Sequence, residues 1–427
     1  MAGRMERVVE PLEVIVSAVK ARRLRGASLA APSDGGIAQL VLDCYSDAPS
    51  SYSRPLDEIG IHVVSAGRRA ERARALGVDG SSRRFSTPYG SLALATVALT
   101  YGPLPLLDYP PLGYDYPVRL EPAQPFIAAY AALGVRHGLV ATESPADHPY
   151  EPPPLDGSEG RGGYTLADIE DEVRTRLETL GLGIAVREAR EGDLVLLDGP
   201  LYQRPWAQEV RESPHLRDDW RELTRERVEV LEEGADGRVA VVGSVKRLGK
   251  SRLLVRVHDA MCDRLGLGAF PPQDNDQAEA IQLASLYVEE NGLSGFEPLL
   301  VGPLLLRPPD ELRSDFGVDV PEIVYSYVVV PRLPYRGSLD AACGVLRLEV
   351  LREVYDSEGL DVFFRALGEG VTQGSQLPPA QAFADARCRQ TSRALFELLC
   401  RLALMEGLEL SHETLLEYNR AGEEYAE

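Results

Sequence analysis

The apolar residues of this chain recur with two different spacings, which predict strands in some segments and helices in others. Runs of strand length, in which apolar residues are continuous or alternate with polar ones, lie at 74–79, 91–101, 193–201, 238–245, 296–306, 323–330 and 344–350. Apolar residues at helical spacing predict helices over 5–24, 165–180, 276–290, 380–405 and 411–425, and shorter or mixed helical segments over 206–233 and 360–368. This order predicts an α/β fold, with a mixed sheet flanked by helices and a helical C-terminal part.

Two segments interrupt the pattern and are predicted to be irregular. Residues 31–60 are rich in Ser, Asp and Pro apart from the apolar run Ile37–Cys44, and residues 103–163 are dense in proline. We interpret 103–163 as a surface insertion that decorates the core, with a helix at Phe126–Leu133 and a strand at Pro117–Leu120. The predicted division of the chain is a packing or dimerisation helix within 1–30, followed by one domain over 31–427 that carries this insertion.

Two of the predicted strands end in an aspartate followed by a glycine, at Asp79-Gly80 and Asp198-Gly199. One interpretation of the first pair is a hairpin turn, because Asp-Gly between apolar runs favours tight turns. A tight hairpin needs about two loop residues, however, whereas roughly ten separate Asp79 from the next apolar run. The helix expected between the two aspartate strands predicts a crossover, which makes them parallel neighbours. Their carboxylates would then meet at one edge of the sheet.

Two aspartates at neighbouring strand ends form a candidate site for divalent cations. Adjacent strands lie about 4.8 Å apart, and carboxylate oxygens are ligands that hard divalent cations favour. A third carboxylate is expected from the helix at 165–180, where Glu178 lies beside Leu177 and Leu180 on the face that should pack on the sheet. The other acidic residues of this helix are expected to form a solvated face. Two metals about 3.5–4 Å apart can activate water and stabilise the leaving oxygen of a phosphodiester.

Composition and charge narrow the class of protein. The 427 residues are 44% hydrophobic and 26% charged, and no apolar run approaches the roughly 20 residues of a membrane span. The N-terminus lacks a signal-peptide core, so we expect a cytoplasmic protein without membrane contact. Five dispersed cysteines and six dispersed histidines argue against disulfides and a structural zinc site. The formal charge of −21 by itself points away from nucleic acid, although arginines that line a channel can still bind DNA.

Basic residues gather where the predicted strand at 238–245 ends. Lys246-Arg247 begins a turn that runs to Ser251 and nearly matches a phosphate-binding P-loop. The first glycine of that motif is missing, and the residues after Ser251 are expected to form a strand instead of the helix that a P-loop needs. A basic hairpin that touches a phosphate backbone is therefore the favoured interpretation.

A late predicted strand carries an arginine and a glutamate on one face. In Val345–Val350 the apolar residues alternate with Arg347 and Glu349. Two interpretations stay open. The pair is either a cross-strand ion pair, which stabilises little if it is exposed, or Arg347 faces the scissile phosphate of a substrate.

The order of these pieces resembles that of the archaeal NurA nuclease family over about residues 70–400. Val78-Asp79-Gly80-Ser81-Ser82 followed by a long apolar strand resembles the first motif of the family, and Leu196-Leu197-Asp198-Gly199-Pro200-Leu201 resembles its second aspartate motif. Glu178 stands where the family places a helical glutamate. The resemblance extends to the family's strand ending in a Lys-Arg pair and to its late Arg-x-Glu strand, at Gly243–Arg247 and Val345–Glu349.

The resemblance implies an RNase H-like fold and a metal-dependent DNA nuclease that uses Mn²⁺ or Mg²⁺. It implies a 5'–3' exonuclease, with single-strand endonuclease activity as a second option, that acts in DNA end resection for double-strand-break repair. It also implies a homodimer that works with HerA, a hexameric ATPase and translocase. The metal ligands carried over by the resemblance are Asp79, Glu178 and Asp198. The residues expected to hold single- or double-stranded DNA are Ser81, Arg83, Lys246, Arg247 and Arg347.

One late motif departs from the family pattern. The family commonly carries Tyr-Pro and, several residues on, a His near the start of a late helix. Here Leu377-Pro378 replaces the Tyr-Pro, and Asp385 stands where the His is expected. Asp385 is therefore a candidate catalytic residue, as a ligand or a base. The departure also leaves an alternative function, a catalytically weakened scaffold that docks the translocase ring on DNA.

Overall fold

The computed structural model describes most of the chain, including the sheet and the helices that cover it. The described residues are 52–64, 74–88, 90–111, 115–120, 126–130, 166–202, 214–249, 251–268, 270–293, 297–308, 317, 319–331, 343–368 and 377–423, together with positions 9, 12, 13, 16, 17 and 20. The predicted run Ile37–Cys44 and most of the predicted insertion after residue 130 lie outside them.

The described strands form one mixed sheet in the order β1-β8-β9-β10-β7-β6-β2-β3-β4, and β5 also pairs with β3. The strands are β1 (Tyr52–Val63), β2 (Ala75–Thr87), β3 (Gly90–Tyr101), β4 (Leu104–Tyr109), β5 (Phe126–Tyr130), β6 (Leu194–Asp198), β7 (Ala240–Val245), β8 (Leu299–Arg307), β9 (Ile323–Pro331) and β10 (Cys343–Leu351). Apolar residues fill the sheet interior, as the strand-length runs predict. The mixed α/β class expected from the sequence is confirmed.

The centre of the sheet contains its parallel part. β2 pairs with β6 and β6 with β7 in parallel, whereas β2, β3 and β4 form an antiparallel meander. The crossovers into β6 and β7 are made by α2 (Leu166–Glu188) and α4 (Pro214–Asp236). The predicted parallel pairing of the two aspartate strands is therefore confirmed, and α2 extends about two turns beyond its predicted end at residue 180.

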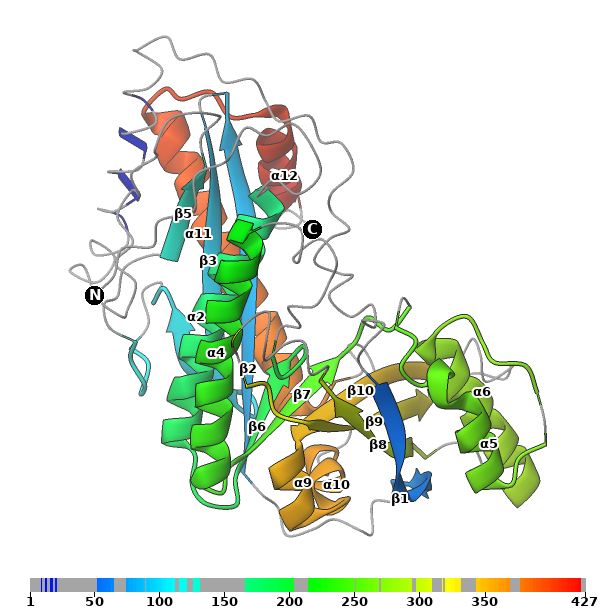
Figure 1. Ribbon diagram of the computed structural model, residues 1–427. Coiled ribbons are helices and arrows are strands. Elements are labelled where there is room, and N and C mark those ends of the chain that lie inside the picture. Colours follow the sequence, from blue (N-terminus) through cyan, green and yellow to red (C-terminus); the bar gives the residue numbers. More distant parts are fainter. Residues whose placement is uncertain are drawn as a thin grey trace.

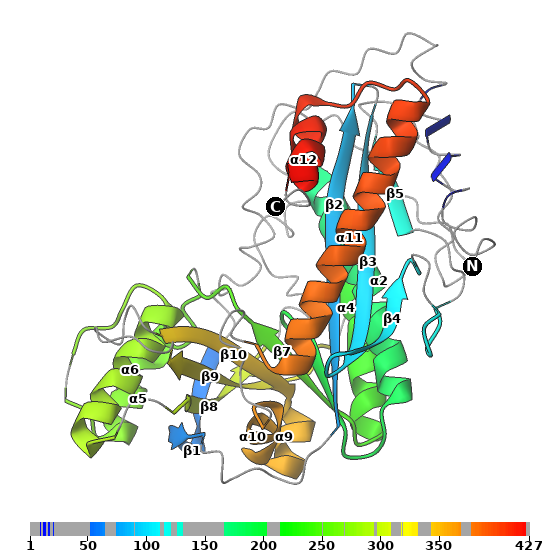
Figure 2. The ribbon, with the colours of Figure 1, turned by 180° about the vertical axis from the view of Figure 1, so that it is seen from behind.

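Helices cover both faces of this central part. α2 and α4 lie against one face (Figure 1), and the long helix α11 (Pro379–Met405) crosses the other (Figure 2). A glycine in β2 permits a close approach of α11, because a Cβ added at Gly77 would lie 2.2 Å from the carbonyl oxygen of Ala380. The start of α11 is thereby held at backbone distance from the strand that carries Asp79.

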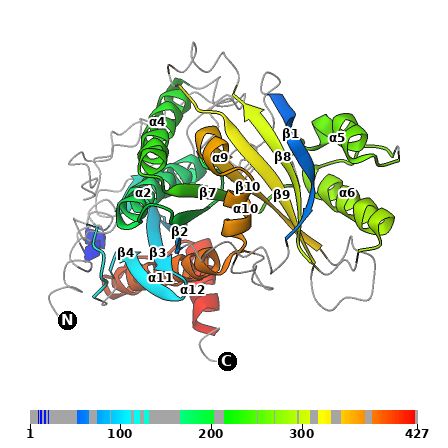
Figure 3. The same cartoon turned by 90° about the horizontal axis from the view of Figure 1, so that it is seen from below.

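The rest of the sheet curves away as an antiparallel extension of β10, β9, β8 and β1 (Figure 3). One face of this extension carries α5 (His258–Leu265) and α6 (Asp276–Asn291), and the other carries α9 (Arg352–Glu358). Beside α9, α10 (Asp361–Ala366) lies against β6 and β7. Of these helices, the sequence patterns predict α6 and α10 but miss α5 and α9. Both missed helices are only a turn or two long, which is too short for a clear helical period.

Several predictions for the irregular segments are wrong. β1 occupies the end of 31–60, and β4 and β5 lie within 103–163, so both segments contribute strands to the sheet. The predicted helix at Phe126–Leu133 begins as the strand β5, and Pro117–Leu120 forms no strand. Short apolar runs carry no reliable period, and pairing with β3 decides the conformation of β4 and β5.

The described positions of the N-terminal segment are helical, as predicted. Leu12 and Val16 are buried in a small apolar cluster with Phe396 and Leu399 of α11, which fits the packing role. Dimerisation through this helix stays a prediction. Among the helices that the structure describes, none combines the length and the apolar character that a membrane crossing requires.

Candidate metal centre

Asp79 lies in the middle of a strand, not at a strand end as predicted. β2 continues past it to Thr87 and pairs with β3 as a hairpin that closes between Thr87 and Gly90, well beyond the Asp-Gly pair. Gly80 serves packing in place of a turn, because a Cβ at this position would lie 2.9 Å from Oε2 of Glu178. The hairpin interpretation was thus right about the pairing of the two strands and wrong about its turn.

The register between β2 and β6 brings the two predicted aspartates together. Val78 is aligned with Leu197 in the parallel pair, so the next residues, Asp79 and Asp198, lie side by side on the same face of the sheet. Asp198 is the last residue of β6, as predicted, whereas Asp79 is buried with 5% of its surface exposed. Their position depends on strand register and not on any local motif.

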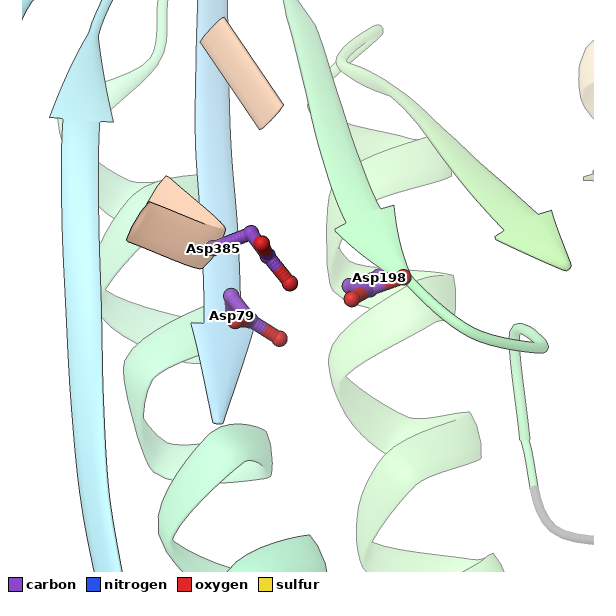
Figure 4. Close-up of side chains that lie close together, drawn as sticks. All are labelled: Asp79, Asp198 and Asp385. Atoms are coloured by element: carbon purple, nitrogen blue, oxygen red, sulfur yellow. The ribbon is translucent and has the colours of Figure 1, made fainter. Parts of the chain in front are cut away.

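A third aspartate reaches this face from the C-terminal helix. Asp385 lies on α11, about two turns from the helix start. One carboxylate oxygen from each of Asp79, Asp198 and Asp385 lies within 4.8 Å of the other two. Figure 4 shows the three side chains pointing towards a common point from β2, β6 and α11. We call these three residues the aspartate cluster.

Glu178, the predicted third ligand, approaches from the other face of the sheet. Its Oε2 lies against the backbone of Gly80, and its Oε1 accepts a 2.9 Å hydrogen bond from Arg227 of α4. Both side chains of this ion pair are buried. The third carboxylate of the cluster is therefore Asp385, and metal ligation by Glu178 stays a prediction. The sequence misses Arg227 because its partner lies on another helix.

Two basic side chains contact the aspartate cluster. The Lys246 ammonium lies 2.6 Å from Oδ2 of Asp198 and 3.3 Å from Oδ1 of Asp385. Arg389, one helical turn after Asp385, donates to the same Oδ1 at 2.9 Å. Lys246 was predicted to hold DNA, and the structure places it among the carboxylates. Arg389 was not predicted, although its i,i+4 spacing from Asp385 is a signal that the sequence contains.

The electrostatics of the cluster favour a cation. Burial raises the pKa of Asp79 well above its ordinary value, and the neighbouring Asp198, Glu178 and Asp385 carboxylates raise it further, against the opposing effect of Lys246. Burial lowers the pKa of Lys246, but Asp198 in direct contact, Asp385 and Asp79 outweigh that effect and raise it overall. The cluster thus concentrates negative charge, and the Lys246 ammonium balances part of it.

The donor set fits a hard divalent cation. Three carboxylates from three different elements converge, and each offers an oxygen to the same point. All-oxygen sites suit Mg²⁺ and Mn²⁺, whereas thiolates and imidazoles would favour softer metals. The positive potential of a bound divalent ion would also offset the burial and mutual repulsion that raise the pKa of Asp79.

Arg347 is fully buried, so the interpretation that it faces a scissile phosphate is wrong. Its Nε donates to Oε1 of Glu349 at 3.0 Å, and its Nη1 donates to Ser251 at 3.1 Å. Glu349 in turn accepts the backbone N–H of Leu201 at 3.2 Å, which fixes the chain just after Asp198. The structure therefore supports an ion pair between these two residues, although it forms within β10 and not across strands as the sequence interpretation had it.

The remaining residues predicted to contact DNA differ in their exposure and in the ion pairs that they already make. Arg247 is exposed beside Lys246, and Ser81 is half-buried on β2, two residues beyond Asp79. Arg83 pairs with Glu417 of α12 (His412–Glu423), and its guanidinium lies 6.0 Å from the ring centre of Phe396. A DNA phosphate at Arg83 would have to replace the Glu417 carboxylate.

A buried polar network missed by the sequence analysis surrounds Asp276. This carboxylate accepts hydrogen bonds from the Ser251 hydroxyl at 2.5 Å and the Tyr327 hydroxyl at 2.6 Å. It also accepts three backbone N–H groups, those of Leu253, Leu254 and Val255. The segment after Ser251 turns into a short 3-10 helix and α5, so the strand predicted there is wrong. Asp276 captures the first amides after this P-loop-like turn. The rejection of a P-loop stands on its missing first glycine, whereas the argument from a following strand is wrong.

Comparisons with known structures find solved NurA proteins. The NurA nuclease from Sulfolobus solfataricus has a TM-score of 0.38 and 13% identity, and the alignment covers 86% of this chain and 91% of that one. A structure of NurA bound to dAMP and manganese has a TM-score of 0.38 and 10% identity over 90% of this chain and 94% of that one. A third, NurA with manganese, has a TM-score of 0.36 and 10% identity over 90% and 96%.

Sequence comparison carries the assignment. A comparison with curated proteins finds no match. The family model described as the NurA domain, however, matches residues 74–383. The matched region contains Asp79, Asp198 and Lys246 and ends two residues before Asp385. Because this region spans well over half of the 427 residues, the chain belongs to the NurA family.

Proposed function

We propose that this protein is a metal-dependent DNA nuclease whose active site is the aspartate cluster. The observation that carries the proposal is the convergence of Asp79, Asp198 and Asp385 within 4.8 Å, in a chain of the NurA nuclease family. Bound divalent cations would lower the pKa of water towards the working pH and stabilise the leaving oxygen of a phosphodiester. We expect Mn²⁺ or Mg²⁺, bound in a two-metal arrangement.

The side chains of this protein have separate roles in the proposed site. Asp79 and Asp198, held in register by neighbouring parallel strands, bind cations, and Asp385 completes the set from α11. Glu178 contributes a negative charge to the site from the opposite face of β2, and the Arg227 guanidinium offsets part of that charge. Arg247 and Arg389 are exposed near the cluster and would contact the phosphate backbone of the DNA.

The proposal extends to the fold, which we expect to be RNase H-like, as the resemblance to the family implies. The strand order β4-β3-β2-β6-β7 supports an RNase H-like core, with an antiparallel meander followed by two parallel strands that enter through α2 and α4. Asp79 lies on the central strand β2 of this unit. In this interpretation the antiparallel strands β10-β9-β8-β1 extend the RNase H-like core at one edge.

Its place in DNA metabolism is likewise proposed. We expect 5'–3' exonuclease activity in DNA end resection for double-strand-break repair, by a homodimer that works with a HerA-type hexameric translocase. These expectations come from membership of the NurA family. The substrate is expected to be DNA ends, in single- or double-stranded form, and the arginines around the cluster support a phosphate-bearing substrate.

The test is the substitution Asp198→Asn, which keeps the shape of the side chain and removes its charge. We expect cleavage of end-labelled linear DNA in Mn²⁺ to fall by at least about a hundredfold, since losing a partner that merely orients a ligand already costs about 10–100-fold. Asp356→Asn is the matched control, because Asp356 is more than half exposed and pairs only with Arg352 among the contacts that the structure gives it. The control should cleave at the wild-type rate.

A negative result has a defined meaning. If the wild-type chain cleaves no DNA in Mn²⁺ or Mg²⁺, with or without the translocase, the nuclease assignment fails and the scaffold alternative is favoured. The scaffold alternative rests on the replacement of the family tyrosine by Leu377 and of the family histidine by Asp385, as the resemblance implies. Full activity in Asp198→Asn would leave a nuclease but move its active site away from the aspartate cluster.

A further inference from the structure

The Lys246 ammonium occupies the part of the aspartate cluster where a bound cation would bind. It contacts Oδ2 of Asp198 at 2.6 Å and Oδ1 of Asp385 at 3.3 Å, and 30% of its side chain is exposed. A divalent cation needs oxygen atoms of the same two carboxylates. Metal binding and the present contacts of Lys246 therefore compete for the same acceptors.

The charge balance of the cluster points in the same direction. Three carboxylates face two cations, Lys246 and Arg389, and Arg389 contacts only Asp385 among the three. When a divalent cation binds, two positive charges join the cluster. With both basic side chains still in place, four positive charges (two from the ion and one each from Lys246 and Arg389) would face three carboxylates. A divalent ion and an ammonium that share the same carboxylates would repel each other strongly. We therefore expect one of the two basic side chains to move away from the carboxylates.

Lys246 is the side chain suited to move. Its ammonium is a compact charge on a flexible four-carbon stem, and it lies at the end of β7 beside the exposed Arg247. Arg389 is already two-thirds exposed and sits at the rim of the cluster, so displacing it would free no space between Asp198 and Asp385. A short rotation of the lysine stem would move its charge towards solvent, where a DNA phosphate would lie.

We propose that Lys246 is a tethered cation that neutralises the aspartate cluster in the metal-free protein, and that divalent-metal binding releases its ammonium to the DNA backbone. The inference rests on the proposed function, because it requires the cluster to be the metal site. It assigns Lys246 two positions, of which the structure shows the first. The same lysine thereby lowers metal affinity in the free protein and contributes to substrate binding in the loaded one.

The first experiment measures Mn²⁺ affinity by titration calorimetry on wild type and Lys246→Met. Removing the competing ammonium should tighten Mn²⁺ binding on the order of tenfold, the equivalent of one charge-assisted hydrogen bond. DNA cleavage by the same variant should become slower, because the released charge is missing. Tighter metal binding together with slower cleavage is a combination that loss of a merely structural contact would not produce.

Two control variants separate direct competition from other effects. Lys20→Met makes the same chemical change at an exposed lysine that pairs with Glu406, and its Mn²⁺ affinity should equal that of wild type. Arg247→Met removes one positive charge beside Lys246 from a residue that is exposed to solvent. It should tighten binding by much less than Lys246→Met, because it changes the local potential without freeing an oxygen.

The second experiment follows the lysine itself in the wild-type protein. The chain has three lysines, Lys20, Lys246 and Lys250, so amine labelling read out by peptide mass spectrometry resolves each one. Labelling of Lys246 should rise several-fold when Mg²⁺ is added, whereas labelling of Lys20 should stay constant. This measurement needs no variant and so does not depend on whether Lys246→Met folds.

The outcomes distinguish the inference from the function on which it rests. If wild-type protein binds no Mn²⁺, both are overturned. If it binds Mn²⁺ and cleaves DNA, but Lys246→Met binds the ion no more tightly and Mg²⁺ leaves Lys246 labelling unchanged, the nuclease assignment stands and the tethered-cation role is rejected. A rise in labelling with tighter binding in the variant supports both.

Discussion

The aspartate cluster and the polar network around Asp276 are both built from acidic and basic side chains, but they satisfy their charges differently. Asp276 is fully buried and accepts five hydrogen bonds from hydroxyl and backbone donors that are fixed in place. The three aspartates of the cluster face each other, and a lysine and an exposed arginine supply their positive partners. The network is a closed structural unit, whereas the cluster is open to exchange of its cation.

This difference shows what separates a structural charge from a functional one in this fold. Buried ionic groups are tolerated when every lone pair has a fixed donor, and they then position the surrounding chain. The network holds the segment after Ser251 and, through Arg347 and Glu349, the chain that follows Asp198. In the cluster the partners of the carboxylates are a half-buried lysine, an exposed arginine and a long 3.5 Å contact from the Gln381 amide to Asp198. Burial and the neighbouring carboxylates raise the pKa of Asp79, which favours an exchangeable cation.

The largest change in stability should come from breaking the polar network around Asp276. Arg347→Ala leaves Glu349 as an uncompensated buried charge and should lower the free energy of unfolding by about 3–5 kcal/mol. Denaturant unfolding in EDTA measures it, with Arg352→Ala as control. Arg352 begins α9 directly after the same strand, and its partly exposed pair with Asp356 should contribute less than about 1 kcal/mol. A similar loss in the free energy of unfolding in both variants would mean that the buried network stabilises the fold no more than a partly exposed ion pair does.

A smaller change in stability is expected when a divalent cation binds to the aspartate cluster. A ligand at one hundred times its dissociation constant stabilises the folded state by about 2.7 kcal/mol. Thermal unfolding with and without Mn²⁺ should therefore show a clear rise in Tm for wild type, which EDTA reverses. Asp385→Asn should lose most of this rise, whereas Asp356→Asn should keep it. An unchanged rise in Asp385→Asn would remove Asp385 from the metal site.

The smallest expected effect lies in the pH dependence of the stability of the metal-free protein. The pKa of Asp79 is raised in the folded state, mainly by burial, so over the range above its ordinary value of 3.8 the unfolded chain has lost a proton that the folded protein keeps. Unfolding then releases a proton, and the contribution of this group to stability falls as the pH rises towards the raised pKa. Asp79→Asn should be more stable than wild type at neutral pH in EDTA and should show a flatter profile in that range. Parallel profiles for the two proteins would contradict the burial of an ionisable Asp79.

Local patterns along the chain were sufficient for the central elements. The apolar runs predicted β6, β7, β8, β9 and β10, and helical periods predicted α2, α4, α6, α11 and α12. These elements are long or strongly apolar, and their patterns follow directly from the face that each buries. The crossover between the aspartate strands also followed from their order, because a helix between strands favours a parallel pair. Such inferences need no knowledge of distant contacts.

The errors occurred where contacts with other elements, and not the local pattern, decide conformation. β4 and β5 are short, and β3 determines that they are strands. The segment after Ser251 has the apolar composition of a strand, but the Asp276 carboxylate captures its amides and turns it into a helix. Gly80 has the sequence signature of a turn and is in fact a packing position beneath Glu178. In each case a tertiary contact outweighed the local preference.

The sequence by itself determined that Asp79 and Asp198 lie on neighbouring parallel strands, because that follows from the order of apolar runs and a crossover helix. Only the tertiary structure decided which other side chains join them. Asp385 and Lys246 reach the cluster because α11 packs on one face of β2 and β7 ends beside β6. Glu178 stays on the opposite face, since side chains of adjacent strand residues point to opposite sides of a sheet. Local periodicity fixes the face on which a residue lies, whereas the convergence of faces depends on how distant elements pack.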